Sequence, residues 1–398
     1  MFEIIKLNLL SNKKNTDQWK IPLYKVLTDK EDIKQVSNVL KRGTDWAIGP
    51  EIEKFETSFA EYIGRKYCVA FNSGTSAGHA ALIALGISGK FEILVPSFTF
   101  IATANWPLMI QASPKFVDIE TQTYGIDPED LESKISKKTK VVIPIHYAGL
   151  PCKIDKIQEI SKKKKLHLIE DASESIGSFI NGRKIGTFGD ISIFSFAGNK
   201  ILTTGEGGAL CTNSKKLYEK IKLIRSHGRL TNSRYFSSIQ TPIYNSLGYN
   251  WRMSSITAAL ALSQLNKIEK MIDMRRKNAQ YFSLKLKKFK QIRLHDEPIS
   301  YKHVYQLYSI LLPNSKIRTK LTNFLASKGI MSKVFFEPAH KTAFFKKIGY
   351  ANTVLPNTDT ISKRILSLPM FPTIRKEEIN YMVDSIAEFF EYTNNQSN

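Results

Sequence analysis

Apolar residues in this chain form short continuous runs that alternate with longer stretches of helical spacing. The runs predict strands over Tyr67–Phe71, Phe91–Pro96, Lys115–Asp118, Lys140–His146 and Leu166–Asp171. The stretches predict helices over Asp29–Leu40, Glu51–Tyr62, Ala77–Leu85, Pro128–Ile135 and Lys153–Lys164. Strands separated by helices are typical of βαβ units, so the pattern predicts an α/β fold with a large, mostly parallel sheet.

A second, smaller domain is predicted where the pattern changes, after about residue 274. One long amphipathic helix is expected over 254–286, with Ile256, Leu260, Ile268 and Ile272 on one side. Beyond it, expected strands at 305–312, 331–340 and 366–372 alternate with helices at 318–328 and 376–392. We therefore expect an N-terminal arm at 1–20, a large domain at 21–273 and a small domain at 274–398. A polar and aromatic stretch at 230–246 is expected to form a loop over the site, and a polar tail begins at 393.

One lysine, Lys200, stands in the otherwise apolar segment Ile191–Thr212, which predicts two strands around a turn. A partly buried amine loses the hydration that favours its charged form and becomes nucleophilic, as a Schiff base with a carbonyl cofactor requires. The alternative is a surface lysine whose amine reaches water. A glycine-rich turn, TTGEGGA, follows Lys200, and Asp171 ends a strand about thirty residues upstream. These two features favour a cofactor site.

The segment Asn72–Ser76 joins a predicted strand to a predicted helix. Free amide groups, hydroxyls and the positive end of a helix meet in such a turn, which predicts a phosphate site on Gly74, Thr75 and Ser76. Helix capping alone would also explain the hydroxyl residues. The turn is neither a Walker loop nor a GxGxxG fingerprint, which argues against nucleoside-triphosphate or dinucleotide chemistry.

The formal net charge of +22 is the one unusual feature of the composition. It could attract nucleotides, nucleic acid or membranes. The lysine runs are short and lack interleaved aromatic residues, however, which favours an ordinary solvated surface. We therefore expect no nucleic-acid or membrane partner. No signal peptide or membrane span is recognisable, so a cytoplasmic protein is expected, and Cys68, Cys152 and Cys211 are expected to be small core residues.

Five motifs occur in one order: NSGTSA, VPSFTFIATAN, IEDASESIGS, FSFAGNKILTTGEGGAL and GYNWRM. Together they resemble the DegT/DnrJ/EryC1/StrS sugar aminotransferases, from about Ile21 to Phe390. The resemblance implies the PLP-dependent transferase fold type I (aspartate-aminotransferase-like), in which helices cover both faces of the large sheet and a smaller C-terminal α/β domain follows. It also implies pyridoxal 5′-phosphate as the cofactor, with pyridoxamine phosphate as an intermediate.

The resemblance also assigns roles around the cofactor. Lys200 forms the Schiff base, and Asp171 pairs with the pyridinium nitrogen and keeps it protonated, so that the ring can accept electrons. Phe100 stacks on the ring, for which core packing is the alternative. Ser195 binds the phosphate, and Asn199 lines the pocket. Glu174 lies near the phenolic oxygen, where many relatives carry His or Gln, and its role stays open.

Other positions concern the edges of the site. Asn250, in GYNWRM, corresponds to a residue that contacts the phosphate bound by the other subunit, which implies a homodimer with shared active sites. Trp46 is expected either near the substrate entrance or as a core anchor. Phe336 and His340 are expected in a closing wall, with a structural role for His340. Glu206 is expected to bond backbone amides.

Among the family, the motifs are most similar to those of enzymes that make 4-amino-4,6-dideoxy sugars, such as perosamine synthases. This similarity implies transfer of an amino group from glutamate to a GDP- or UDP-linked 4-keto-6-deoxyhexose, with Lys200 moving the proton. A 3-keto sugar is the alternative within the class, and a lyase or racemase is a third possibility. From a different class, a basic nucleic-acid-binding protein on a degenerate scaffold is the competing hypothesis.

Overall fold

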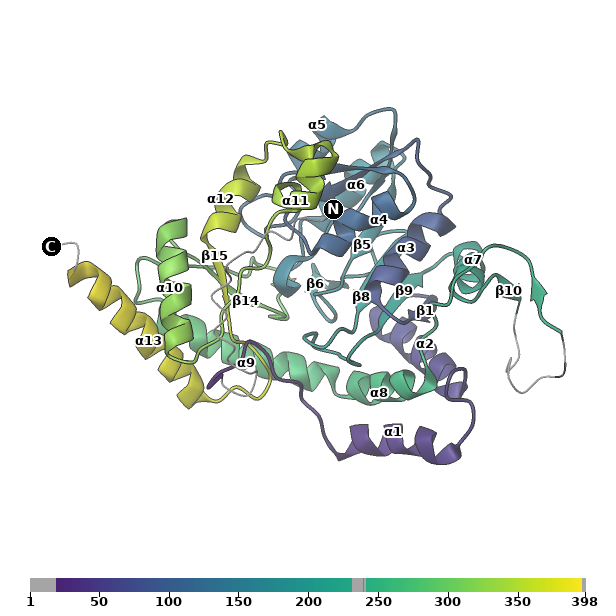
Figure 1. Cartoon of the computed structure of the whole chain (residues 1–398), viewed down its shortest axis with the longest axis horizontal. Helices are drawn as coiled ribbons and strands as arrows, with labels where there is room; N and C mark the ends of the chain where they lie inside the picture. The colour runs from purple at the N-terminus through teal and green to yellow at the C-terminus, as the bar shows by residue number, and fades with distance from the viewer. Residues whose placement is uncertain (1–18, 231–238, 240, 396–398) are drawn as a thin grey trace, which may run out of the picture.

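The structure is a computed structural model that describes residues 19–230, 239 and 241–395. Residues 1–18 of the predicted N-terminal arm, the middle of the predicted loop at 230–246 and the end of the C-terminal tail lie outside these residues. The described ends of that loop form a short antiparallel pair, β10 (Arg229–Leu230) with β11 (Ile243–Tyr244). In Figure 1 β10 lies beyond α7 (Lys215–Arg225), at the edge of the fold.

A seven-stranded sheet forms the centre of the large domain, in the order β1-β9-β8-β5-β4-β2-β3. Its strands are β1 (Tyr67–Phe71), β2 (Glu92–Pro96), β3 (Ser113–Val117), β4 (Thr139–Val142), β5 (His167–Asp171), β8 (Ile191–Ser195) and β9 (Gly208–Thr212). β9 pairs antiparallel with both β1 and β8, whereas the other pairs are parallel. The predicted strands and the mostly parallel sheet are confirmed.

Two apolar layers cover the two faces of this sheet (Figure 1). One layer holds the buried residues of α2 (Pro50–Ile63), α5 (Pro128–Lys134), α6 (Ile154–Lys163) and α8 (Ser255–Asn266). The other holds those of α3 (Gly74–Ala84), α4 (Ile101–Met109) and α7. Neighbouring strand residues such as Leu94 and Val95 point into opposite layers, as the two-residue period of a strand requires. The three cysteines are buried free thiols, as predicted.

The C-terminal part has its own core around an antiparallel sheet of β12 (Arg293–Leu294), β14 (Tyr308–Leu311) and β15 (Ile365–Leu368). The helices α9 (Ile268–Leu286), α10 (Ser315–Ser327) and α13 (Lys376–Asn395) contribute to this core, and α12 (Pro356–Arg364) lies nearby, on the left of Figure 1. The expected strands at 305–312 and 366–372 and the expected helices at 318–328 and 376–392 have counterparts in β14, β15, α10 and α13. Because α9 crosses residue 274, the boundary itself stays a prediction.

Two expectations for this part were wrong. The single helix at 254–286 is two helices, because Lys267 leaves the helical conformation (φ −115°, ψ 11°). Its amine pairs there with Asp29 and Asp32, at the start of α1 (Lys30–Arg42). Segment 331–340 is not a strand. It pairs with the small antiparallel sheet only at Lys333, which lies opposite Ser367 of β15. Its consecutive apolar residues, Val334, Phe335 and Phe336, pack instead on a small apolar cluster beside the large sheet.

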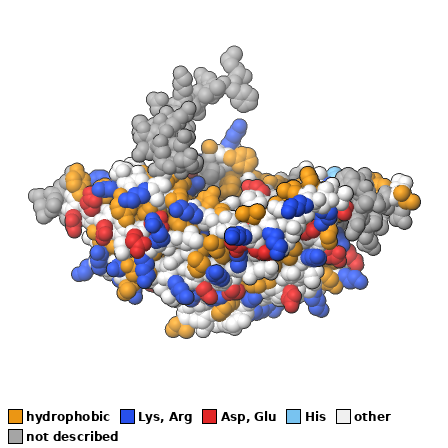
Figure 2. Space-filling model, turned by 90° about the horizontal axis from the view of Figure 1, so that it is seen from below, with side chains coloured by type: hydrophobic (Ala, Val, Ile, Leu, Met, Phe, Trp, Pro, Cys, Tyr) orange, Lys and Arg blue, Asp and Glu red, His pale blue; other side chains and the backbone are white. Residues whose placement is uncertain are grey.

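No helix in the described part of the chain is long and apolar enough to cross a membrane. On the face shown in Figure 2, Lys and Arg side chains are interspersed with Asp and Glu. That mixture agrees with the interpretation of the high net charge as a solvated surface.

Candidate active site

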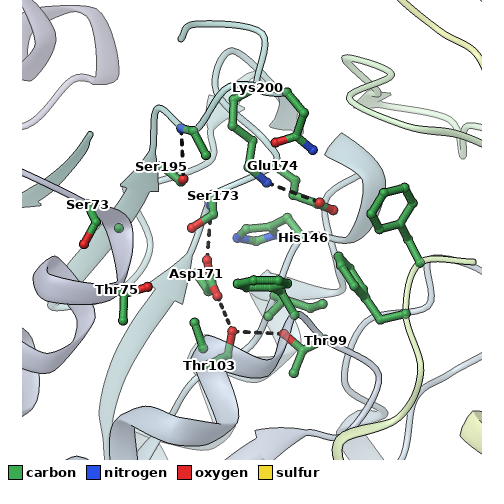
Figure 3. A pocket seen from close by; sticks show the side chains of 18 of the residues that line it. Ser73, Thr75, Thr99, Thr103, His146, Asp171, Ser173, Glu174, Ser195 and Lys200 are labelled. Carbon is green, nitrogen blue, oxygen red and sulfur yellow. Dashed lines mark hydrogen bonds and ion pairs between the residues drawn. The ribbon is translucent and has the colours of Figure 1, made fainter. Parts of the chain in front are cut away.

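A cavity of about 330 Å³ lies at the carboxyl ends of the parallel strands, between the large sheet and segment 331–340 (Figure 3). Ligand sites in open α/β sheets collect at this edge, so the location agrees with the sheet pattern. The predicted residues that line the cavity are Gly74, Thr75, Phe100, Asp171, Glu174, Ser195, Asn199 and Lys200. Ser76 and Asn250 do not line it.

Lys200 follows β8 on a tight turn, in which its backbone N–H donates to the carbonyl of Ala197. The side chain is 13% exposed and points into the cavity, which excludes the alternative of a surface lysine. The return strand β9 starts at Gly208, where a Cβ would lie 2.4 Å from the backbone nitrogen of Gly74. Glycine at 208 therefore lets the first turn of α3 approach the two strands that carry Lys200.

Asp171 is the last residue of β5, and its carboxylate is held in a fixed orientation. Oδ2 accepts a hydrogen bond of 2.6 Å from the Thr103 hydroxyl, and Oδ1 accepts one of 3.2 Å from the Ser173 amide. Thr103 in turn accepts from Thr99 at 2.9 Å. Asp171 is buried and lines the cavity, so this carboxylate is available to a protonated ring nitrogen.

The amino end of α3 supplies an anion site. Ser73 caps the helix: its hydroxyl accepts from the Ser76 amide at 3.1 Å, and its carbonyl accepts from the Ala77 amide. This leaves the amides of Gly74 and Thr75 without partners in the helix, beside the hydroxyl of Ser195. The Ser76 hydroxyl bonds to Ser73 at 2.9 Å instead of facing the cavity. Ser73 therefore takes the place in the cavity wall that was expected for Ser76.

Aromatic side chains form the wall of the cavity opposite β5 and β8. Phe100 is 60% exposed in this chain, which excludes core packing as its role. Its ring centroid lies 6.1 Å from that of Phe336, which was expected in this wall. Trp106 closes the phosphate end, where its indole N–H donates to the carbonyl of Thr75. A flat ring can therefore lie against Phe100 between these groups.

Glu174 contacts the nucleophile directly. Its Oε1 lies 3.4 Å from Nζ of Lys200, and its Oε2 accepts a hydrogen bond of 2.8 Å from the Ala148 amide. Both side chains are nearly buried, at 13% exposure for Lys200 and 11% for Glu174. A second carboxylate is therefore tolerated near the cofactor position because it faces an ammonium group.

Glu170, the residue before Asp171 in β5, is fully buried and accepts hydrogen bonds from the backbone of segment 186–189. Burial by itself would raise the pKa of Glu170, but the proximity of His146, the charge of Arg65 and hydrogen bonds from backbone amides bring it below the ordinary value. His146 lines the cavity; its Nδ1 accepts from the Cys152 amide at 3.2 Å, so its proton is on Nε2, 3.5 Å from Glu170.

Sequence reasoning missed several residues of the cavity wall, namely Ser73, Thr99, Thr103, Trp106, His146, Ser173 and Phe335. A signal for some of them was present, because Thr99 and Ser173 follow strand ends within three residues and His146 is the last residue of a predicted strand. Asn250 is exposed and makes an isolated bridge with Ser226, away from the cavity of its own chain.

Three further expectations have clear outcomes. Trp46 is 45% exposed and donates to the carbonyl of Val39, so it is neither a core anchor nor part of this chain's cavity wall. His340 is buried, with Nδ1 2.6 Å from the Ser97 hydroxyl, which agrees with a structural role, but it does not line the cavity as the expected closing wall would require. Glu206 is exposed at the cavity, and in the described residues its carboxylate has none of the amide hydrogen bonds expected of it.

The sequence was then compared with known proteins. A family model, that of the DegT/DnrJ/EryC1/StrS aminotransferase family, matches residues 27–387. This chain belongs to that family. The recognition made from the five motifs is thereby confirmed, and with it the aminotransferase activity class and pyridoxal phosphate as the cofactor.

Individual family members are similar over nearly their whole length. GDP-perosamine synthase of Escherichia coli O157:H7 is 35% identical over 370 residues, which cover 93% of this chain and 98% of that protein. A UDP-4-amino-4,6-dideoxy-N-acetyl-beta-L-altrosamine transaminase of Campylobacter jejuni is 33% identical over 372 residues, which cover 91% of this chain and 96% of that protein. The structure of PseC, an aminotransferase of Helicobacter pylori, superposes with a TM-score of 0.87 at 29% identity. The superposition covers 94% of this chain and 99% of PseC. These neighbours confirm the predicted fold type I.

The residues of the cavity fit pyridoxal phosphate. The two free amides at the start of α3 can take its phosphate, the fixed carboxylate of Asp171 can take its ring nitrogen, and Lys200 can reach its carbonyl. Within the described residues, Lys200 is the only cation in the wall, against the carboxylates of Asp171, Glu174 and Glu206. Binding of several anionic groups would therefore depend on helix and amide dipoles, or on cations from another subunit.

Proposed function

We propose that this sugar aminotransferase transfers an amino group from glutamate to a nucleotide-linked 4-keto-6-deoxyhexose. The observation that carries the proposal is the convergence of Lys200, Asp171 and the start of α3 in one cavity, in a chain similar from end to end to GDP-perosamine synthases. A GDP-linked sugar is the first candidate. The Campylobacter jejuni transaminase is the observation that favours a UDP-linked sugar as the second.

Pyridoxal phosphate supplies an electrophilic carbonyl and a ring that can take up an electron pair. Lys200 would hold that carbonyl through Nζ, with loss of water, and once a donor amine takes its place the freed Nζ would take and return a proton. Asp171 keeps the proton on the ring nitrogen, since Thr103 and Ser173 hold its two oxygens. Glu174 holds Nζ in place while that nitrogen is protonated.

The walls of the cavity are suited to the sugar end of such a substrate. Phe100, Phe335 and Phe336 present apolar surface beside Lys200, which can exclude water and accept the apolar face and methyl group of a deoxysugar. The diphosphate of the nucleotide carries charge that Lys200, the one cation among the described residues of the cavity wall, does not balance. We also propose a homodimer in which Asn250 of one subunit contacts the cofactor phosphate bound by the other, as the resemblance around GYNWRM implies.

The test is the absorbance spectrum of the purified protein, with and without glutamate. We expect a visible band that glutamate bleaches and that is absent from Lys200→Ala. Lys153→Ala is the matched control, because Lys153 is also partly buried and ion-paired, 3.3 Å from Glu120, but does not line the cavity. GDP- and UDP-linked 4-keto and 3-keto sugars then identify the acceptor by the position of the amine in the product. Absence of a band after addition of pyridoxal phosphate would contradict the proposal.

A further inference from the structure

Gln306 connects the C-terminal domain to the turn that carries Lys200. It lies two residues before β14, and its side chain is buried, at 4% exposure. It does not line the active-site cavity, so it cannot contact a substrate there. A buried amide has two donors and a carbonyl oxygen to satisfy, and the position of its partners therefore shows what it holds.

Both ends of the Gln306 amide bond to the backbone on either side of Lys200. Oε1 accepts a hydrogen bond of 3.0 Å from the amide of Ile201, and Nε2 donates one of 2.8 Å to the carbonyl of Asn199. The amide of Lys200 itself donates to Ala197 within the turn. The backbone of residues 199–201 is thus fixed by a side chain that comes from another domain.

The backbone of Gln306 is itself firmly held. Arg275, on α9, is buried at 2% exposure, and its Nη1 donates to the carbonyls of Tyr305 at 3.0 Å, Met370 at 3.0 Å and Gln306 at 3.4 Å. Burial lowers the pKa of Arg275 to about 9. Burial of a guanidinium group carries a desolvation penalty, which its hydrogen bonds to the three carbonyls offset. These hydrogen bonds fix the backbone just before β14, where Gln306 lies.

The same segment also contacts the turn that orients Glu174. The Leu307 amide donates to the carbonyl of Ala148, and the Val304 amide donates to that of Gly149. A Cβ at Gly149, whose φ is +92°, would lie 3.1 Å from the Gln306 nitrogen. The Ala148 amide in turn donates to Glu174, which pairs with the amine of Lys200. Segment 304–307 therefore holds the backbone around Lys200 through Gln306, and holds the amine of Lys200 indirectly, through Ala148 and Glu174.

We propose that Gln306 is a positioning residue for Lys200, through which the C-terminal domain sets the reach of the nucleophilic amine. The proposal rests on the proposed function for the role of Lys200. A lysine has four flexible methylenes, so an amine that must attack one carbon and return a proton needs a fixed backbone. Gln306 supplies that fixed point without contacting substrate or cofactor.

The test uses Gln306→Met, which keeps the volume of the side chain and removes both hydrogen bonds. We expect kcat to fall about 10- to 100-fold, with KM for the nucleotide sugar changed less than about threefold, because misplacement of a reacting group affects the chemical step. Deuterium exchange in the cofactor-free protein gives a second readout: the amide of Ile201 should exchange at least about tenfold faster in Gln306→Met, since its acceptor is gone.

Gln306→Glu is the second variant, which also serves if Gln306→Met fails to fold. A glutamate still accepts from Ile201, but it donates to Asn199 only when protonated. Its activity relative to the wild type should therefore rise as the pH falls. Gln264→Met is the matched control: Gln264 is 1% exposed and donates to Leu27 and Asp32, at 3.0 Å each. It should change neither kcat nor exchange at Ile201.

The outcomes separate this inference from the proposed function. Wild-type kcat in Gln306→Met, or loss of kcat without faster exchange at Ile201, would overturn the role of Gln306. Faster exchange at Ile201 in a protein that binds no pyridoxal phosphate would instead contradict the proposed function and leave the contact established. Equal effects from Gln264→Met would show that the loss reflects general destabilisation, which also overturns the inference.

Discussion

The carboxylate of Glu174 lies 3.4 Å from the amine of Lys200, and both side chains are nearly buried. The same carboxylate accepts from the amide of Ala148, a residue with a positive φ of 58° in the turn after β4. Glu174 therefore joins two elements of the site, the lysine turn after β8 and the turn that carries His146. The negative charge of Glu174 acts on Lys200, and its acceptor oxygen binds the Ala148 amide. Two substitutions can distinguish these roles.

Glu174→Gln should keep the acceptor for Ala148 and lose only the negative charge beside Lys200. We expect folding stability within about 1 kcal/mol of the wild type and a fall in kcat of about tenfold. Glu174→Leu should in addition leave the buried Ala148 amide unpaired and lower the free energy of unfolding by about 1–3 kcal/mol. Urea unfolding and steady-state kinetics measure both effects. Equal stability of the two variants would contradict the assigned bond to Ala148.

Thr103→Val should weaken the function of Asp171 while leaving Asp171 in place. The Thr103 hydroxyl donates to Asp171 Oδ2 at 2.6 Å, and valine keeps its shape without the donor. We expect weaker cofactor binding and a fall in kcat of about 10- to 150-fold, since one oriented hydrogen bond to a charged group contributes about 1.5–3 kcal/mol. Cofactor titration by absorbance measures the first and initial rates the second. Thr123→Val is the control, because Thr123 bonds to another buried carboxylate, Glu120, away from the cavity.

Some site residues could be found because their chemistry contrasts with that of their neighbours along the chain, whereas Phe100, Glu174, Ser195 and Asn199 came from the family resemblance. Lys200 and Asp171 each interrupt or end an apolar run, and Gly74 and Thr75 sit between a strand and a helix. The sheet was predictable because most residues of its strands are apolar and buried on both faces of the sheet.

The remaining residues depend on contacts between distant segments. Thr103 reaches Asp171 across 68 positions, and Gln306 reaches Ile201 across 105. Nothing near Thr103 or Gln306 in the sequence marks those partners. Segment 331–340 was mistaken for a strand because its apolar residues match strand propensity, although Phe335 and Phe336 belong to the cavity wall.

Stability should fall as the pH drops below about 6.5, and His303 should account for part of the loss. Burial, aided by nearby His295 and Arg276, holds the pKa of His303 well below its ordinary value of 6.5. The unfolded chain therefore takes up a proton first, so the contribution of neutral His303 is complete above about pH 6.5 and declines below it, by up to about 1.4 kcal/mol per pH unit.

His303→Asn removes this titration while its amide oxygen can still accept from the Tyr305 amide, as Nδ1 of His303 does at 3.0 Å. Urea unfolding between about pH 7.5 and about pH 5 should show a shallower pH dependence in the variant than in the wild type. The exposed His167→Asn serves as the control. Identical slopes in wild type and His303→Asn would show that His303 is not the group that titrates.

Subunit mixing tests whether two chains share each active site. Lys200→Ala removes the nucleophile, and Asn250→Asp places a carboxylate where the proposed dimer binds a phosphate, so each variant alone should be nearly inactive. Asn250 does not line the cavity of its own chain. In a hybrid dimer, one of the two sites then combines intact Lys200 from one subunit with intact Asn250 from the other. Random mixing makes about half of the dimers hybrids, so about a quarter of the wild-type activity should return.

Mixing Lys200→Ala with Asp171→Asn is the control, because both residues belong to the same chain's cavity, and no activity should return. If the Asn250→Asp mixture also stays inactive although hybrids form, Asn250 does not act across the interface.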